Sequence, residues 1–142
     1  MQTIGIVLNV GKDKTEEFEA GFREMEAPVW ADLRSRGLLT MATLTRLDST
    51  TKKVDGAAQY LVVAIFADDR GHHEHDNDPR FEAWNTRADA YQIAEPFVFG
   101  GDTIVNEGPY GPRRPAQVAG SGPPAPGTRQ VTGRGDRRRR GA

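Results

Sequence analysis

The order of hydrophobic patterns in the first 107 residues constrains the fold more than any other feature of this sequence. Four segments have the apolar or alternating character of strands, and they span residues 4–10, 38–47, 60–66 and 97–105. Two further segments carry apolar residues at spacings of three and four, as on one face of a helix. Those residues are Phe18, Phe22, Met25, Val29 and Leu33 in the first segment, and Phe81, Trp84, Ala88 and Tyr91 in the second. The predicted order is therefore β-α-β-β-α-β.

Several residues predict where these elements begin, bend and end. Pro28 interrupts the first helical pattern, and we expect a kink or a break near Ala27 because proline removes a backbone donor. The polar stretch 68–78 is expected to be a loop, with Asp78 capping the helix that starts at Pro79. A bulge or bend is expected at Gly100-Gly101 in the last strand.

This order of elements predicts an α+β domain of the ferredoxin-like type, with a four-stranded antiparallel sheet. Two helices can cover only one face of such a sheet. The other face would expose many apolar residues, among them those of the central segment 60–66. We therefore expect a homodimer in which two sheets pack face to face.

The last 35 residues follow a different pattern and predict a flexible basic tail, so the expected division is a domain at 1–107 and a tail at 108–142. The tail holds eight arginines and one aspartate, whereas all the other acidic residues precede residue 108. Its Gly/Pro-rich composition cannot bury enough surface to fold. Arg137–Arg140 could contact an anionic surface, but no aromatic residue interleaves with them, which argues against a nucleic-acid partner. The tail could equally contact the acidic domain.

Other features bound the location and the cofactors. The chain has no cysteine, its N-terminus lacks the pattern of a signal peptide, and no apolar run approaches the roughly 20 residues that cross a membrane. We therefore expect a cytoplasmic protein that does not enter the membrane. No G-x-G-x-x-G follows the first strand, which argues against a dinucleotide cofactor.

The element order, the Phe81-x-x-Trp84 pair and Asn9 in the first predicted strand carry a family resemblance. On these features, residues 3–107 resemble the dimeric α/β-barrel superfamily, in particular the antibiotic-biosynthesis monooxygenases. The resemblance implies a cleft between helices and sheet that holds a small hydrophobic molecule, aromatic or polyketide-like. It also implies catalysis without a metal, flavin or other cofactor. The haem-degrading relatives carry a histidine in the second helix, and residues 90–94 contain none, which argues against haem.

The same resemblance assigns roles to four residues. Asn9 and Tyr91 would donate hydrogen bonds to the substrate and stabilise its anion, while Trp84 and Phe81 would line the cleft. The alternative is that the aromatic residues are ordinary core side chains.

All three histidines of the chain lie together at positions 72, 73 and 75. His73 or His75 would be the best general base, since histidine titrates near neutral pH. Two alternatives remain open, a solvated polar connection and a weak zinc or nickel site. The sequence thus predicts a cofactor-independent enzyme that performs oxygenation, or cyclisation or isomerisation driven by proton transfer. The competing hypothesis is a non-catalytic ligand-binding or stress-responsive barrel protein with an interaction tail.

Overall fold

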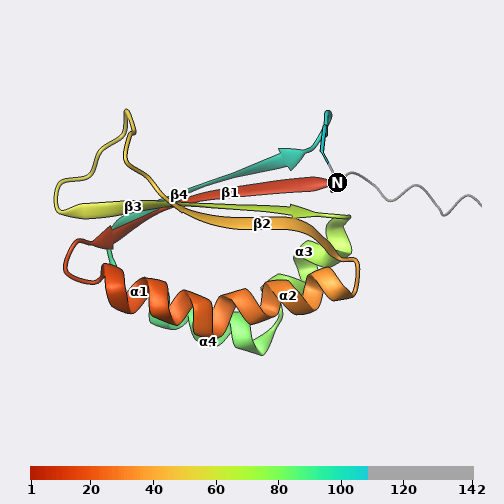
Figure 1. Ribbon diagram of the computed structural model, residues 1–142, viewed down its shortest axis with the longest axis horizontal. Coiled ribbons are helices and arrows are strands. Elements are labelled where there is room, and N and C mark those ends of the chain that lie inside the picture. Colours follow the sequence, from red (N-terminus) through yellow and green to blue (C-terminus); the bar gives the residue numbers. More distant parts are fainter. Residues whose placement is uncertain (109–142) are drawn as a thin grey trace, which may run out of the picture. The chain divides into compact units, whose positions relative to one another are not determined.

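The computed structural model describes residues 1–108, so the expected basic tail, from residue 109 on, lies outside the described residues. Within residues 1–108 the chain forms a four-stranded antiparallel sheet with helices packed on one face (Figure 1). The predicted α+β, ferredoxin-like fold class is confirmed. None of the helices in this part of the chain is long and apolar enough to cross a membrane.

The sheet has the strand order β2-β3-β1-β4, and every neighbouring pair is antiparallel. The strands are β1 (Gln2–Gly11), β2 (Leu39–Arg46), β3 (Ala57–Phe66) and β4 (Gln92–Asp102). The two central strands, β1 and β3, are the most apolar, as expected for strands with neighbours on both sides. Side chains alternate between faces, so Ile4, Ile6 and Leu8 point to the helices and Val7 points away.

The first helical segment continues through Pro28, and its hydrogen bonding changes just before this residue, near Ala27 as expected. The helical segment runs without interruption through α1 (Thr15–Gly21), η1 (Phe22–Glu26) and α2 (Ala27–Ser35) (Figure 1). The η1 turn is π-helical, and the N–H of Ala27 donates to the carbonyl of Phe22, five residues back. Proline cannot donate and its ring crowds the carbonyl four residues earlier, so a wider turn just before it relieves both problems.

The predicted loop at 68–78 is wrong, because most of it is a helix. The structure has α3 (Asp69–Asp76) followed by α4 (Pro79–Asp89). The Asp68 side chain accepts from the N–H of Gly71 and caps α3, while Asp78 caps α4 as expected. The segment is so polar that it has no apolar stripe to indicate a helix, and only Gly71 and His75 of α3 are buried.

The last strand also differs from the prediction. It begins at Gln92 and runs through Pro96, which an edge strand tolerates because the missing N–H can face away from the ladder. The irregular pairing with β1 lies opposite Asn9, whereas Gly100 and Gly101 pair in regular register. The expected bulge is therefore displaced towards the start of the strand.

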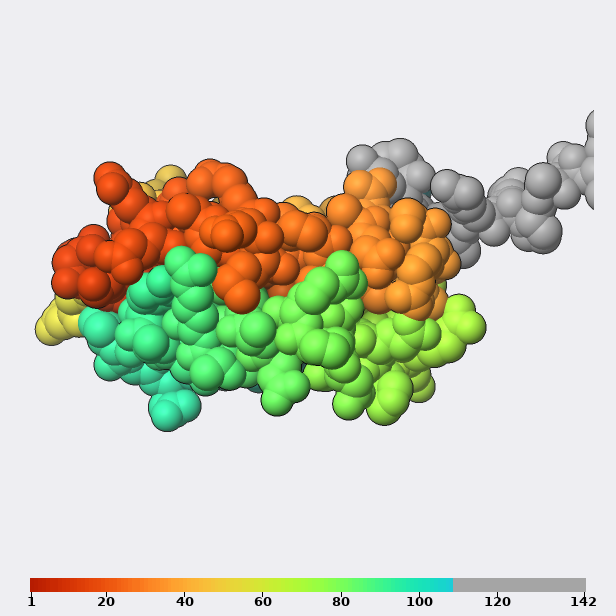
Figure 2. Space-filling model, turned by 90° about the horizontal axis from the view of Figure 1, so that it is seen from below, coloured from red at the N-terminus to blue at the C-terminus, as the bar shows by residue number. Residues whose placement is uncertain are grey.

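Two groups of buried side chains fill the space between sheet and helices. One surrounds Phe18, Tyr60 and Trp84, and the other surrounds Leu33 and Phe66. Figure 2 shows the helical layer that covers them, with the first helical segment beside α3 and α4. The two groups together frame the cavity described below.

Much of the opposite face of the sheet is apolar and exposed in the single chain. Phe97 and Phe99 on β4 are 54% and 44% exposed, and their rings lie 5.4 Å apart on this face. Val7, Leu61 and Val63 share the same face by register. An apolar surface of this kind is typical of a protein interface.

Candidate functional site

A cavity of about 460 Å³ lies between the helical layer and the sheet. This volume is within the range of small-molecule sites, roughly 300–1,000 Å³. Most of its wall is apolar, and this part is formed by Ile4, Ile6, Leu8, Phe22, Trp30, Val62, Ala64, Phe66, Phe81, Trp84, Ala88, Val98 and Phe99. The exposed lining residues include Asn85 on α4 and Val98 and Gly100 on β4, so the cavity opens between these two elements.

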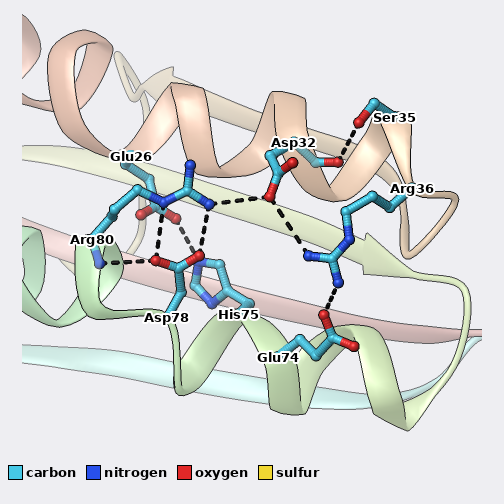
Figure 3. A network of polar contacts seen from close by, with 8 residues as sticks. All are labelled: Glu26, Asp32, Ser35, Arg36, Glu74, His75, Asp78 and Arg80. Carbon is cyan, nitrogen blue, oxygen red and sulfur yellow. Dashed lines mark hydrogen bonds and ion pairs between the residues drawn. The ribbon is translucent and has the colours of Figure 1, made fainter.

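One wall of this apolar cavity carries a buried carboxylate–imidazole pair. The Nε2 atom of His75 lies 2.6 Å from Oε1 of Glu26, and the two residues are 9% and 3% exposed (Figure 3). Glu26 comes from the π-helical turn and His75 from α3. A charged pair at this depth is stable only with good geometry, because desolvation of each charge costs several kcal/mol.

Glu26 ends the π-helical turn and lies on the apolar face of the first helical segment. It stands four residues after Phe22 and three before Val29, and at about 100° of rotation per residue these spacings place the three side chains on one side of the helix. Glu26 and Phe22 are both buried, whereas Met25 is only partly buried. Glu26 is a site residue that the sequence analysis missed.

Both ring nitrogens of His75 face carboxylates, which favours the imidazolium form. Nδ1 lies 3.1 Å from Oδ1 of Asp76, opposite the Glu26 contact. Desolvation lowers the pKa of His75, but the hydrogen bonds and charges of Glu26 and Asp76 outweigh it, so the pKa is raised above 6.5. Because both nitrogens are engaged, His75 does not present a free base to a ligand.

The free acceptor on this wall is the second oxygen of Glu26. Its Oε2 atom is buried and has no hydrogen-bond partner within residues 1–108. The Oε1 atom of Gln92, which also lines the cavity, is buried and unpartnered in the same part of the chain. Buried polar atoms are nearly always hydrogen-bonded in native proteins, so such atoms in a cavity need an explanation.

The pair is linked to the protein surface through Asp76 and His72. Oδ2 of Asp76 lies 3.1 Å from Nε2 of His72, and Nδ1 of His72 lies 2.9 Å from Oε1 of Gln2. The His72 ring stacks on Phe66, with centroids 5.1 Å apart. The Asp76 side chain is half exposed, so this chain of contacts joins the buried Glu26–His75 pair to solvent.

An ion-pair network on the surface above the site ties three helices together. Arg80 contacts Asp78 at 2.7 Å and Asp32 at 3.1 Å, and Arg36 bridges Asp32 and Glu74 (Figure 3). The hydrogen bond and charge of Arg80 lower the pKa of Asp78. Exposed pairs contribute little stability one by one. Their common effect is to hold α3, which carries His75, against α2 and α4.

The structure brings three of the predicted site residues together. Phe81, Trp84 and His75 all line the cavity. The Phe81 ring lies against the His75 imidazole, with centroids 4.1 Å apart, and Trp84 packs on Phe22 at 5.7 Å. The assignment of catalysis or substrate binding to these residues stays a prediction.

The other three predicted site residues lie away from the cavity. Asn9 points to the opposite face of the sheet, where its amide donates to the carbonyl of Glu95 and accepts from Gln59. His73 is exposed and contacts Asn77 on the outer side of α3. The hydroxyl of Tyr91 accepts a hydrogen bond from Arg87 and does not line the cavity. The geometry does not support these residues as donors or base in this cavity.

The sequence contains a weak signal for Glu26. It stands four residues after Phe22 and three before Val29, so a charged residue occupies the apolar stripe. Of the three histidines, His72 and His75 both contact Asp76, whereas His73 contacts Asn77. Among residues 1–108, no group of three or more His, Asp or Glu side chains is arranged to hold a metal ion.

The fold can be compared with solved structures. A proposed antibiotic biosynthesis monooxygenase from Caulobacter crescentus matches with a TM-score of 0.62 and 23% identity, over 73% of this chain and 90% of that chain. A similar protein from Nitrosomonas europaea matches with a TM-score of 0.60 and 10% identity, over 74% and 100% of the two chains.

A dimeric ferredoxin-like protein of unknown function from Jannaschia sp. CCS1 matches with a TM-score of 0.57 and 11% identity, over 72% of this chain and 100% of that chain. No protein-family model and no curated protein matches the chain. At these identities the likeness defines the class of fold. The expected resemblance to antibiotic-biosynthesis-monooxygenase-like proteins of the ferredoxin fold is confirmed at that level.

Proposed function

We propose that the protein is a small cofactor-independent enzyme that acts on a hydrophobic aromatic or polyketide-like molecule in this cavity. The observation that carries the proposal is the buried Glu26–His75 pair in the wall of an otherwise apolar cavity of about 460 Å³. A buried ionisable pair in an apolar pocket, here with the pKa of His75 raised by its carboxylate partners, is a common arrangement of a catalytic acid or base. Solved structures with the same fold, described as proposed antibiotic biosynthesis monooxygenases, give independent support.

The geometry favours Glu26 as the base and His75 as the charge that assists it. Oε2 of Glu26 is free to take a proton from a phenol, or from a carbon next to a carbonyl. The adjacent imidazolium of His75 then faces a neutral carboxyl group and a substrate anion, which it stabilises electrostatically. Phe81 and Trp84 would hold the aromatic body of the substrate.

Two outcomes are open to such a substrate anion. In cyclisation or isomerisation, Glu26 returns the proton to another atom of the substrate. In oxygenation, the anion itself donates electrons to molecular oxygen: a CH₂ group becomes a carbonyl, and the second oxygen atom leaves as water with the two hydrogens. Both routes need only the substrate, molecular oxygen in the second case, and the residues of this wall, without a metal or an organic cofactor.

We also propose that the working form is a cytoplasmic homodimer. The uncovered apolar face around Phe97 and Phe99 supports a sheet-to-sheet dimer, as does the dimeric protein of the same fold. The absence of cysteine supports a reducing compartment.

A turnover assay with matched variants tests the proposal. Full-length protein is incubated with a panel of phenolic tricyclic ketones, with and without oxygen, and products are followed by mass spectrometry. Turnover by the wild type should fall about 100- to 10,000-fold in Glu26→Gln, because general-base catalysis contributes that much. His73→Gln is the control, since His73 lies outside the cavity. Wild-type rates in Glu26→Gln would refute the assignment, and tight binding without turnover would favour a ligand-binding barrel.

A further inference from the structure

We propose that α3 is a lid over one end of the cavity, and that it opens while the rest of the domain stays folded and thereby exposes the carboxylate of Glu26. Three observations carry this proposal, namely the composition of α3, the polar contacts that hold it, and the burial of Glu26 behind it. An open lid would give a substrate access to its base, and this role of the lid rests on the proposed function.

The helix α3 has no apolar side chain with which to anchor itself. Its eight residues, Asp69–Asp76, comprise aspartate, arginine, glycine, glutamate and three histidines, and only Gly71 and His75 are buried. The neighbouring helices α2 and α4 each bury two apolar residues. A segment with few buried apolar contacts opens at a lower cost in free energy than the core does. The helix α3 is therefore the part of the helical layer that opens most easily.

Polar contacts take the place of apolar ones in holding α3 down. Three of them join side chains of this helix to other elements. They are Nδ1 of His72 to Oε1 of Gln2 at 2.9 Å, Glu74 to Arg36, and Nε2 of His75 to Oε1 of Glu26 at 2.6 Å, the last two drawn in Figure 3. The imidazole rings add contacts with Phe66 and Phe81. Polar groups regain hydrogen bonds to water when such contacts break, so each exposed contact adds little net stability.

The residues at both ends of α3 can act as hinges, because they are not helical. Asp68 before the helix has an extended backbone, with φ −157° and ψ −178°, and Asn77 after it has φ −101° and ψ 6°. The next helix, α4, begins separately at Pro79 with its own cap, Asp78. Residues at the ends of elements are the usual hinges of lids. Movement of α3 therefore does not require movement of α4.

The carboxylate of Glu26 is closed off in the structure. Glu26 is 3% exposed, its Oε1 atom is held by His75, and its buried Oε2 atom has no partner in the described residues. A molecule in the cavity therefore does not reach Oε2 until the wall moves. Since His75 belongs to α3, displacement of this helix uncovers the carboxylate, and water or a ligand can then donate to Oε2. The unpaired acceptor thus favours opening, because a buried acceptor without a donor costs free energy.

Chemical labelling of carboxylates tests the opening. Full-length protein is treated at pH 6 with a water-soluble carbodiimide and glycine ethyl ester, to a low extent of reaction, and labelled Glu26 is located by mass spectrometry. Its labelling rate relative to that in unfolded protein gives the fraction of molecules in which the carboxylate is exposed. Hydrogen exchange of the central amides of β3 gives the globally unfolded fraction. The first fraction should exceed the second at least about 100-fold, and it should not change with urea below the unfolding transition, because a local opening exposes little surface.

A pair of matched variants assigns the opening to α3. Glu74→Gln removes the contact between α3 and Arg36 and should raise the labelling of Glu26 about two- to fivefold, as expected for the loss of one exposed ion pair. Glu17→Gln makes the same chemical change in the exposed ion pair with Lys14 at the start of α1, and should leave the labelling unchanged. Hydrogen exchange of the β3 amides should be similar in both variants, since neither residue lies in the core.

The outcomes separate the lid from the proposed function. Labelling of Glu26 no faster than global unfolding allows would overturn the lid, and so would equal labelling of the two variants. Turnover that depends on Glu26, combined with labelling at the global rate only, refutes the lid and leaves the proposed function standing. Labelling through local opening, without turnover of any substrate, supports the lid and refutes the enzyme.

Discussion

Replacing His75 with leucine should destabilise the fold strongly, because Glu26 would remain buried without a partner. In the structure one carboxylate oxygen of Glu26 already lacks a donor, and the 2.6 Å contact to His75 is its remaining polar interaction in the described residues. Removing one member of a buried ion pair costs about 3–5 kcal/mol of unfolding free energy. We expect His75→Leu to fall in that range.

The double variant Glu26→Leu/His75→Leu should recover most of that loss. Replacing both members of a buried pair with apolar side chains of similar volume is often neutral, or stabilising by about 1–4 kcal/mol. The neighbouring Phe22 and Phe81 offer an apolar setting for two leucines. The two substitutions should therefore be strongly non-additive, with the double variant more stable than His75→Leu alone.

Urea unfolding followed by tryptophan fluorescence measures these free energies, since Trp30 and Trp84 both line the cavity. The measurements should be made at pH 6 and at one fixed protein concentration, because stability of a dimer depends on concentration. A loss below about 1 kcal/mol in His75→Leu, where 3–5 is expected for a broken buried pair, would refute the reasoning. Additive losses in the double variant would refute it equally.

Three further results are expected. The raised pKa of His75 gives stability that is fully present below pH 6.5 and is lost as pH rises through the folded pKa, so the urea midpoint should fall above pH 6.5 in the wild type and not in the double variant. Gly71→Ala should cost about 1–3 kcal/mol in thermal melts, because its Cβ would lie 2.3 Å from the carbonyl oxygen of Leu38, whereas Gly101→Ala, with nothing within 4 Å, should change little. Burial and a hydrogen bond to a carboxylate on α1 raise the pKa of Tyr60 to about 12, so stability should fall above pH 10 in the wild type, and Tyr60→Phe should abolish that loss.

The strands and the long helices could be predicted from the sequence because their apolar residues repeat with a clear period. Phe18, Phe22 and Leu33 mark one helical face, and the run ending at Phe66 marks a central strand. The short helix α3 could not be predicted, because it is held by one cap and by burial of Gly71 and His75. Tertiary contacts, which no local pattern encodes, decide its conformation.

The candidate site was predicted only in part, for a related reason. Phe81 and Trp84 lie on the regular apolar face of α4, so their place near the cavity follows from helical spacing. Glu26 stands in the apolar stripe, but the stripe does not tell which side chain of another element a charged residue meets, and His73 and His75 differ only in which side of α3 they occupy. Because the sequence did not predict α3 as a helix, it could not predict which of its histidines faces the cavity.

The π-helical turn also determines what a one-residue deletion would do to the cavity wall. Because the turn contains one residue more than a regular turn, a chain that lacks one of residues 23–25 would return to α-helical bonding. Glu26 would still stand three residues before Val29, and therefore on the same face of the helix. A single deletion would thus move the side chains that precede the carboxylate around the helix axis and keep the carboxylate itself in the wall.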